Sequence, residues 1–334
     1  MFRKLLALSL GAAVLGGGLA AGALFYYARS PLPIGAAPVQ FSLKSGSSLK
    51  SAARQMAEAG VLHRPAAFVL LGRILGRANR IKAGSYEFKA GLTPYALLQK
   101  IARGDVTLMA ITFTEGATFR QMRKLLDEHP KVRHETTALR DAQILERLSI
   151  SETSPEGWFF PDTYYFTEGA IDLAVLRRAH RLMQHHLASQ WEGRAPGLPL
   201  ATPYEALILA SIVEKETGRG EDRPLVATVF VNRLRRGMLL QADPTVIYGL
   251  GETFDGNLRK RDLVADTLYN TYTRGGLPPT PIAMPGLASL AATLNPARSD
   301  VLYFVSRGDG SSHFSRTLTE HERAVTKYQR SGKR

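Results

Sequence analysis

The most constraining feature of this chain is an uncharged run of 23 residues near its N-terminus, from Leu5 to Tyr27. As a helix that rises about 1.5 Å per residue, the run is long enough to cross a hydrocarbon core roughly 30 Å thick. Arg3 and Lys4 precede it, and its last three residues are aromatic, which suits a membrane–water interface. The pattern predicts a single-pass membrane anchor at residues 5–27, preceded by a short cytoplasmic tail at residues 1–4.

The same run has a second interpretation, as a cleaved signal peptide. Ala21-Gly22-Ala23 offers the small residues that a cleavage site requires, and the glycine and alanine content weakens the run as a permanent span. We expect the anchor to be retained, and under either interpretation residues 30–334 lie outside the cytoplasm. A tether rich in Pro, Gly and Ala, without hydrophobic periodicity, is expected at residues 28–38.

The chain is strongly basic and has no cysteine. It carries 43 Lys and Arg against 29 Asp and Glu, a net charge of +14, which favours polyanionic partners. An extracytoplasmic location argues against nucleic acid and for a membrane surface or a polymer that carries carboxylates. The lack of cysteine excludes disulfides, a thiol nucleophile and an iron–sulfur cluster. The sequence also lacks a Gly-rich phosphate loop, HExxH and GxSxG, and its eight histidines show no ligand spacing, so we expect neither a metal nor a cofactor.

Short strands and helices alternate between residues 39 and 153, which predicts an N-terminal α+β region. Strands are expected at 39–43, 84–88 and 108–114, with helices starting near Ser48, Pro65, Thr93 and Thr118. Residues 130–153 are polar and expected to be helical. A long amphipathic helix at 173–191 and a Pro/Gly linker at 193–203 belong to a second, mixed α/β domain at 154–334, in which the catalytic residues are expected.

One predicted helix of this domain, at residues 204–218, carries two glutamates. At about 100° per residue, Glu216 continues the apolar face of Leu209, Ile212 and Val213, whereas Glu214 lies about 200° away from it. A carboxylic acid at the end of an apolar face is partly desolvated, which raises its pKa and suits it to general acid catalysis. The alternative is that both glutamates are solvated charges at a helix end, paired with neighbouring cations.

Polar and aromatic loops supply further candidate side chains. Residues 154–166 combine six aromatic residues with two carboxylates, a composition that suits either sugar binding or a buried aromatic corner of the core. Loops rich in Pro, Gly, Asn and Tyr are typical of the rims of binding sites. The candidate substrate contacts are Glu156, Asp162, Arg233, Gln241, Asp243, Asn270 and Tyr272.

Four motifs, in order along the chain, make it resemble the YceG-like family of endolytic murein transglycosylases. They are EGWFFPDT at 156–163, ASIVEKET at 210–217, LQADPTVIYG at 240–249 and YNTY at 269–272. The similarity continues at Tyr303-Phe304-Val305 and His313-Phe314, and it covers the whole chain. It implies a single-pass protein of the cell inner membrane with its bulk in the periplasm and a LysM-like module in its N-terminal half. It further implies cleavage inside nascent peptidoglycan glycan strands, and we expect peptidoglycan synthases as partners.

The resemblance also assigns the catalytic acid, because the family's catalytic glutamate corresponds to Glu216. Protonated Glu216 would donate to the oxygen that links MurNAc to GlcNAc, and its carboxylate would then take the proton of the C6 hydroxyl to give a 1,6-anhydro-MurNAc end. Two other functions stay open. A hydrolytic muramidase would need a second carboxylate, such as Asp162 or Asp243, to activate water. A non-catalytic module would use the basic surface and the aromatic loops to hold peptidoglycan.

Overall fold

The computed structural model describes residues 2–44 and 46–330, and their contacts divide into two compact units. Unit 1 comprises residues 1–109 together with 165–169, and unit 2 comprises residues 110–164 and 170–334. The boundary falls within β3 (Leu108–Thr112) and β5 (Thr163–Thr167), two strands that pair with each other. It therefore lies well before residue 153, where the sequence was expected to leave its N-terminal region.

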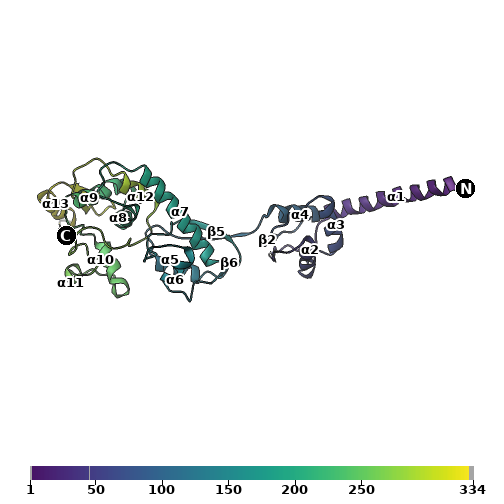
Figure 1. Ribbon diagram of the computed structural model, residues 1–334, viewed down its shortest axis with the longest axis horizontal. Helices are drawn as coiled ribbons and strands as arrows, with labels where there is room; N and C mark the ends of the chain where they lie inside the picture. Colours follow the sequence, from purple (N-terminus) through teal and green to yellow (C-terminus); the bar gives the residue numbers. More distant parts are fainter. Residues whose placement is uncertain (1, 45, 331–334) are drawn as a thin grey trace. The chain divides into compact units, whose positions relative to one another are not determined.

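Unit 1 starts with one long helix, which Figure 1 shows leaving the rest of the unit as a single rod. Its elements are α1 (Phe2–Arg29), β1 (Val39–Leu43), α2 (Leu49–Glu58), α3 (Pro65–Ile74), β2 (Gly84–Phe88) and α4 (Pro94–Arg103). β1 and β2 pair antiparallel, with Val39 opposite Phe88, and α2 packs on α3. Ser48 and Thr93 cap α2 and α4 by accepting a backbone N–H from the first turn. The predicted order of strand, helix, helix, strand and helix is confirmed.

The end of α1 is part of the hydrophobic core of unit 1. Leu24, Tyr27 and Ala28 pack in that core together with Leu32 and Ile34, and the backbone N–H of Leu32 donates to the carbonyl of Leu92 at 2.8 Å. Residues 28–38 are therefore not the loose tether expected from their Pro and Gly content. The N–H of Ile34 also donates to the carbonyl of Leu32 at 2.8 Å, which closes a tight turn around Pro33 between the two buried side chains.

No helix within residues 2–44 and 46–330 combines the length and the apolar character needed to cross a membrane. The anchor expected at residues 5–27 and the cytoplasmic tail at residues 1–4 thus stay predictions. Residue 1 of that tail lies outside the described residues.

Unit 2 is mostly helical and contains small two-stranded sheets. Its elements are α5 (Phe119–Asp127), β4 (Val132–Arg133), α6 (Asp141–Leu148), β6 (Ala170–Ile171), α7 (Asp172–Glu192), α8 (Pro203–Glu216), η1 (Gly220–Asp222), α9 (Arg223–Arg235), α10 (Asp243–Leu250), η2 (Gly251–Thr253), α11 (Lys260–Val264), α12 (Leu287–Leu294), β7 (Tyr303–Ser306), β8 (Ser312–Ser315), α13 (Leu318–Val325) and η3 (Thr326–Arg330). β4 pairs parallel with β6, and β7 pairs antiparallel with β8. The expected mixed α/β architecture is confirmed.

Residues 130–153 are helical only over α6, which corrects the expectation of a helical segment. The cause is Asp172, a buried residue at the start of α7. Its Oδ2 accepts the backbone N–H groups of Glu135 and Thr136 and the hydroxyl of Thr136, at 2.7–2.9 Å. A side chain rather than a helix thus satisfies this stretch of backbone.

Three helices, α8, α9 and α12, pack together at the centre of unit 2. Residues 206–213 of α8 are all buried, so the middle of this helix is surrounded by protein and only its two ends reach a surface. The aromatic segment 154–166 belongs to the interior as well, with Trp158, Phe159 and Phe160 buried and the Phe159 ring stacked on Phe119 at 5.0 Å. Of its two expected interpretations, the structure supports the buried aromatic corner.

Candidate active site

The C-terminal end of α8 opens into a pocket of about 630 Å³ in unit 2. The pocket contains Glu216, the last residue of α8, and draws its other walls from α9, from the start of α10 and from the β7–β8 hairpin. The lining residues are Glu216, Gly218, Arg233, Leu240, Gln241, Asp243, Tyr272, Phe304, Val305, Ser306, Gly310, Ser312, His321, Val325 and Gln329. The structure thereby brings together the predicted acid and four of the seven predicted substrate contacts.

Glu216 has the electrostatic environment of an acid that stays partly protonated at neutral pH. Burial raises the pKa of Glu216 to about 7; the negative charge of Asp243 acts in the same direction, and the Arg233 guanidinium opposes it. A carboxylic acid with a pKa close to the working pH can donate a proton in one step and accept one in the next. The side chain is therefore suited to general acid and general base catalysis.

Asp243 reaches the pocket from the first turn of α10, and its carboxylate is held in place. Tyr272 donates its hydroxyl to Asp243 Oδ1 at 2.5 Å, and burial together with this bond raises the pKa of Tyr272. Two segments far apart in the sequence are thus tied together beside Glu216. Removal of either partner would change both the shape and the charge of the pocket.

Arg233 places a buried positive charge in the pocket wall. Its Nε donates to the carbonyl of Leu302 and its Nη1 to that of Leu240, both at 2.8 Å, and the guanidinium lies 5.2 Å from the centre of the Tyr303 ring. Among the described residues, no carboxylate forms an ion pair with it. Its charge is therefore available to stabilise negative charge in the pocket, as on ionised Glu216.

Gln241 is held in an unusual backbone conformation, with a φ of 50°. Its N–H donates to the carbonyl of Thr271 at 3.0 Å, and the next N–H, of Ala242, donates to the Thr271 hydroxyl at 3.0 Å. Left-handed conformations of residues other than glycine are costly and persist where surrounding contacts enforce them, often at functional sites. The strain fixes how the chain enters α10, and therefore where Asp243 lies.

Two of the predicted contacts, Asp162 and Asn270, do not line the pocket. Asn270 is fully buried; its amide group donates to three backbone carbonyls of residues 262–265, and its Oδ1 accepts the N–H of Tyr272. It shapes the loop that presents Tyr272. Asp162 is exposed, and its Oδ1 accepts the N–H of the next residue, Thr163.

Glu156 also lies outside the pocket and is buried in the protein interior. Its Oε1 accepts the backbone N–H of Phe119 at 3.0 Å, and its Oε2 accepts the hydroxyl of Tyr248 at 3.1 Å. Burial raises the pKa of Glu156 to about 7, although both hydrogen bonds act in the opposite direction. Glu156 therefore connects the start of α5 to α10, instead of facing the pocket as a substrate contact would.

Glu214 and Glu216 have different surroundings, as expected, but for another reason than an apolar helix face. α8 is buried on all sides up to Val213, so its faces do not differ in polarity. Glu214 Oε2 accepts the N–H of Gly286 at 3.0 Å and the hydroxyl of Ser289 at 2.7 Å, and its Oε1 lies 3.8 Å from Arg223 Nη2. These bonds hold Glu214 at the start of α12, away from the pocket.

His321 is a pocket residue that the sequence did not indicate. Its ring is stacked on that of Tyr303, with 5.3 Å between the centres, and its Nδ1 is buried without a hydrogen-bond partner. Burial and the charge of Arg233 lower the pKa of His321, which keeps the imidazole neutral. No motif contains this residue, whereas Phe304 and Val305 lie in a segment that already resembled the family.

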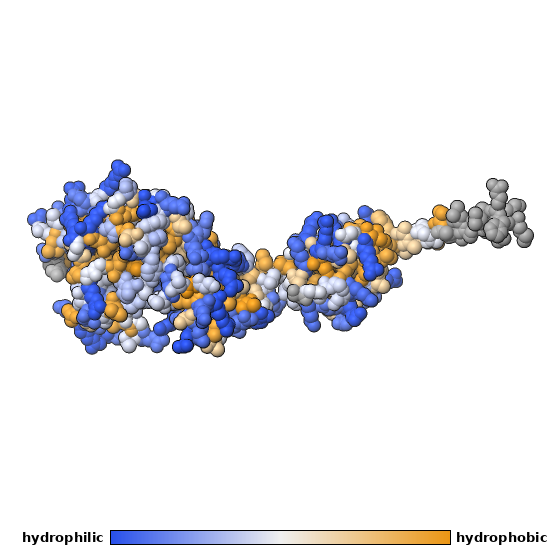
Figure 2. Space-filling view, viewed as in Figure 1, coloured by the Kyte–Doolittle hydropathy of each residue, from blue (hydrophilic) through white to orange (hydrophobic). Residues whose placement is uncertain are grey.

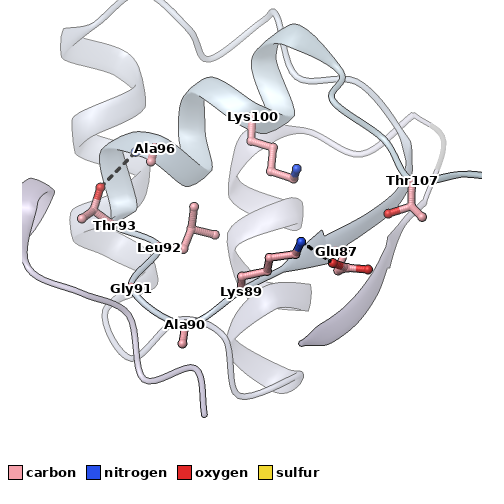
Figure 3. A pocket seen from close by; sticks show the side chains of 9 residues that line it. All are labelled: Glu87, Lys89, Ala90, Gly91, Leu92, Thr93, Ala96, Lys100 and Thr107. Atoms are coloured by element: carbon pink, nitrogen blue, oxygen red, sulfur yellow. Dashed lines mark hydrogen bonds and ion pairs between the residues drawn. The ribbon is translucent and has the colours of Figure 1, made fainter. Parts of the chain in front are cut away.

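Other polar clusters lack the features of this pocket. Unit 1 has a hollow of about 600 Å³. Lys100 of α4 and Lys89, the residue after β2, both line it, and its carboxylate, Glu87, lies 3.3 Å from Lys89 (Figure 3). In unit 2, ligand atoms of Asp127, His134 and Asp172 lie within 4.8 Å of one another. Asp172 Oδ2 already accepts three hydrogen bonds there, which describes a buried hydrogen-bond centre better than a metal site.

A mixed α/β domain that presents one desolvated carboxylic acid in a polar pocket, beside an arginine and a tyrosine–aspartate pair, has the design of an acid–base enzyme. The chain belongs to the YceG-like family, whose sequence profile matches residues 41–327. It is 31% identical to the endolytic murein transglycosylase of Bacillus subtilis, over 92% of this chain and 90% of that protein. It is 27% identical to the endolytic murein transglycosylase of Streptococcus pneumoniae, over 93% of this chain and 63% of that one.

A solved structure supports the same relationship. The crystal structure of a YceG-like protein from Listeria monocytogenes matches this fold with a TM-score of 0.52 and 26% sequence identity. The match covers 86% of this chain and 98% of that chain. The family resemblance seen in the four motifs is thus confirmed.

Proposed function

We propose that this protein is an endolytic murein transglycosylase, which cleaves the MurNAc–GlcNAc bond inside nascent peptidoglycan strands and so ends their elongation. Relatives in Bacillus subtilis and Streptococcus pneumoniae carry this name. The observation that carries the proposal is the position of Glu216, an acid with a pKa of about 7 at the wall of a polar pocket.

Glu216 serves both chemical steps in this proposal. Its protonated form donates to the glycosidic oxygen as the bond breaks, while the N-acetyl group of the substrate supports positive charge at C1. The resulting carboxylate takes the proton of the C6 hydroxyl, which closes onto C1 to give 1,6-anhydro-MurNAc, and no water is consumed. A pKa near 7 suits both transfers, because neither protonation state is then scarce at neutral pH.

The surrounding residues set the acidity and the shape of the site. Asp243 disfavours the ionised form of Glu216 and Arg233 favours it, so the two charges balance the acid between its roles. Gln241 and Tyr272 offer hydrogen-bonding groups in the pocket wall, suited to sugar hydroxyl and acetamido groups.

A hydrolytic muramidase is the second candidate. It needs a carboxylate that activates water, and Asp243 lines the same pocket as Glu216 whereas Asp162 does not. The third candidate, a non-catalytic peptidoglycan-binding module, has less support, because the aromatic segment expected to hold sugars is buried.

Product analysis by mass spectrometry tests these candidates. Purified glycan strands treated with the protein should yield fragments with ends one water lighter than hydrolytic ends, and Glu216→Gln should abolish them while retaining binding. Glu221→Gln, which changes an exposed carboxylate, is the matched control. Hydrolytic ends would favour the muramidase, and cleavage by Glu216→Gln at the wild-type rate would overturn the assignment.

We further propose a location at the cell inner membrane, with an anchor at residues 5–27, the bulk of the chain in the periplasm, a LysM-like module in unit 1 and peptidoglycan synthases as partners. The uncharged run and the order of elements in unit 1 support this arrangement. Cell fractionation should recover the protein with membranes. A mature chain that starts near Leu24 and is free in the periplasm would contradict the anchor.

A further inference from the structure

Positive charge is concentrated in unit 1. Residues 29–109 hold twelve Lys and Arg against three Asp and Glu, a net charge of +9, whereas residues 110–334 have a net charge of +3. All of these twelve cations lie at described positions, and Lys89 forms an ion pair with Glu87 at 3.3 Å. The smaller unit therefore carries most of the attraction for anions, away from the candidate active site in unit 2.

Helix α3 and the residue that follows it expose large aliphatic side chains, and three of these cations lie close to them in the sequence. Leu70, Ile74 and Leu75 are 50%, 64% and 39% exposed. Leu70 and Ile74 lie one turn apart on the same side of the helix, and Arg73 follows Leu70 by three residues and borders them. Arg77 and Arg80 follow in the loop after α3. We call these six residues the α3 patch.

The helix that packs beside α3 exposes apolar surface as well. α1 packs on α3 and α4, and near its end Phe25 and Tyr26 are 60% and 77% exposed, with the Arg29 guanidinium 4.5 Å from the centre of the Phe25 ring. Figure 2 shows hydrophobic residues at the surface of unit 1 where α1 leaves it. Aliphatic, aromatic and arginine side chains thus share this end of the unit.

We propose that unit 1 docks onto an anionic phospholipid surface through the α3 patch. Surface-bound elements of this kind place aliphatic side chains at the boundary of headgroups and acyl chains, while arginines bind lipid phosphates. A water-soluble polymer of carboxylates would also pair with the arginines, but it would leave Leu70 and Ile74 in water. The aliphatic residues therefore favour a lipid as the partner. This inference is independent of catalysis in unit 2.

Partition of the full-length protein onto vesicles tests the proposal. Vesicles that contain phosphatidylglycerol should bind the protein more tightly than pure phosphatidylcholine vesicles. Three arginines, at about fivefold each near an anionic surface, give roughly a 100-fold difference at low salt, which salt should reduce. The variant Arg73→Glu/Arg77→Glu/Arg80→Glu should lose this preference. Lys89→Glu/Lys100→Glu/Arg103→Glu makes the same charge change in unit 1 at and beyond the end of β2 and on α4, around a hollow that no residue of the patch lines, and should retain most of it.

A second readout reports insertion directly. Leu70→Trp should show a blue shift of its added fluorescence on phosphatidylglycerol vesicles and none on phosphatidylcholine. A milder variant guards against the possibility that the charge reversals misfold. It is Arg73→Gln/Arg77→Gln/Arg80→Gln, whose fold is checked by circular dichroism, and its affinity for phosphatidylglycerol vesicles should lie between those of the wild type and the charge reversal. Equal losses in the two triple reversals, or an α3 patch required for binding isolated peptidoglycan but not vesicles, would overturn the proposal.

Discussion

At the scale of single residues, the candidate chemistry depends on two glutamates, two positions apart, that do different work. Glu214 is fixed by the N–H of Gly286 and the hydroxyl of Ser289, while Glu216 lines the pocket. Because α8 ends at Glu216, its last residue lines the pocket instead of packing between the neighbouring helices. The position of the helix end, rather than amphipathicity, separates their roles.

The pH dependence of activity should follow the charge of Glu216. The first step needs the protonated acid, so the cleavage rate should fall as pH rises through about 7. Asp243→Asn removes a negative charge that raises the pKa of Glu216, and should move this fall to lower pH, by about one pH unit or less. Rates measured from pH 5 to 9, with Glu221→Gln as control, check the shift. Complete loss of activity in Asp243→Asn would instead indicate that this carboxylate is itself a base.

Glu214→Gln should lower the stability of the protein and leave its catalytic activity nearly unchanged. The amide oxygen of the glutamine can still accept the hydrogen bonds of Gly286 and Ser289, but its NH₂ group then faces Arg223. The substitution should therefore lower the unfolding free energy by about 1–3 kcal/mol. Denaturant titration measures this loss, and activity per folded molecule should stay close to that of the wild type. An inactive but fully stable Glu214→Gln protein would contradict this assignment.

The sequence predicted much of what lines this pocket, because the candidate contacts Arg233 and Asp243 lie in it together with Glu216. It could not show whether a polar side chain in a loop turns outward or toward its own backbone. Asn270 and Glu156 both satisfy buried N–H or carbonyl groups, and composition alone does not distinguish this role from substrate binding. His321 lies outside every motif and reaches the pocket only through tertiary packing.

At the scale of elements, α10 is held at both ends. Tyr248 in its last turns donates to Glu156, and Asp243 in its first turn accepts from Tyr272. Elements were predictable where local signals decide, as with the caps Ser48 and Thr93. They were not predictable where a distant side chain does, as with Asp172, whose bonds to residues 135 and 136 replace a helix by irregular backbone.

Glu156→Gln should make the stability of the protein less sensitive to pH. The folded pKa of Glu156 is about 7, above its unfolded value, so its contribution is fully present in acid and is lost as pH rises through about 7. Gln keeps both hydrogen bonds, because the Tyr248 hydroxyl can accept from an amide, and it never ionises. Between pH 5 and 8 the wild type should lose about 2–3 kcal/mol more unfolding free energy than the variant. Parallel pH dependences in chemical denaturation would contradict this.

At the scale of the whole molecule, two hydrophobic cores have no residue in common, one in unit 1 and one in unit 2. Leu98→Ala creates a cavity in the first core and should cost about 2–5 kcal/mol there. Calorimetry should show two transitions, of which this variant lowers one, while activity at moderate temperature is retained. A single transition that moves as a whole would mean that the units unfold together.

Residues 165–169 belong to unit 1, although the 55 residues before them belong to unit 2. The ribosome therefore synthesises the last residues of unit 1 only after the first part of unit 2. The hydrogen bond from the Ser85 hydroxyl to Glu168, at 3.3 Å, can form only after that point. The same order of segments along the chain makes it difficult to separate the two units by a single recombination event. A recombination event at residue 109 would carry unit 1 away without its final strand residues, so we expect the two units to be passed on together in evolution.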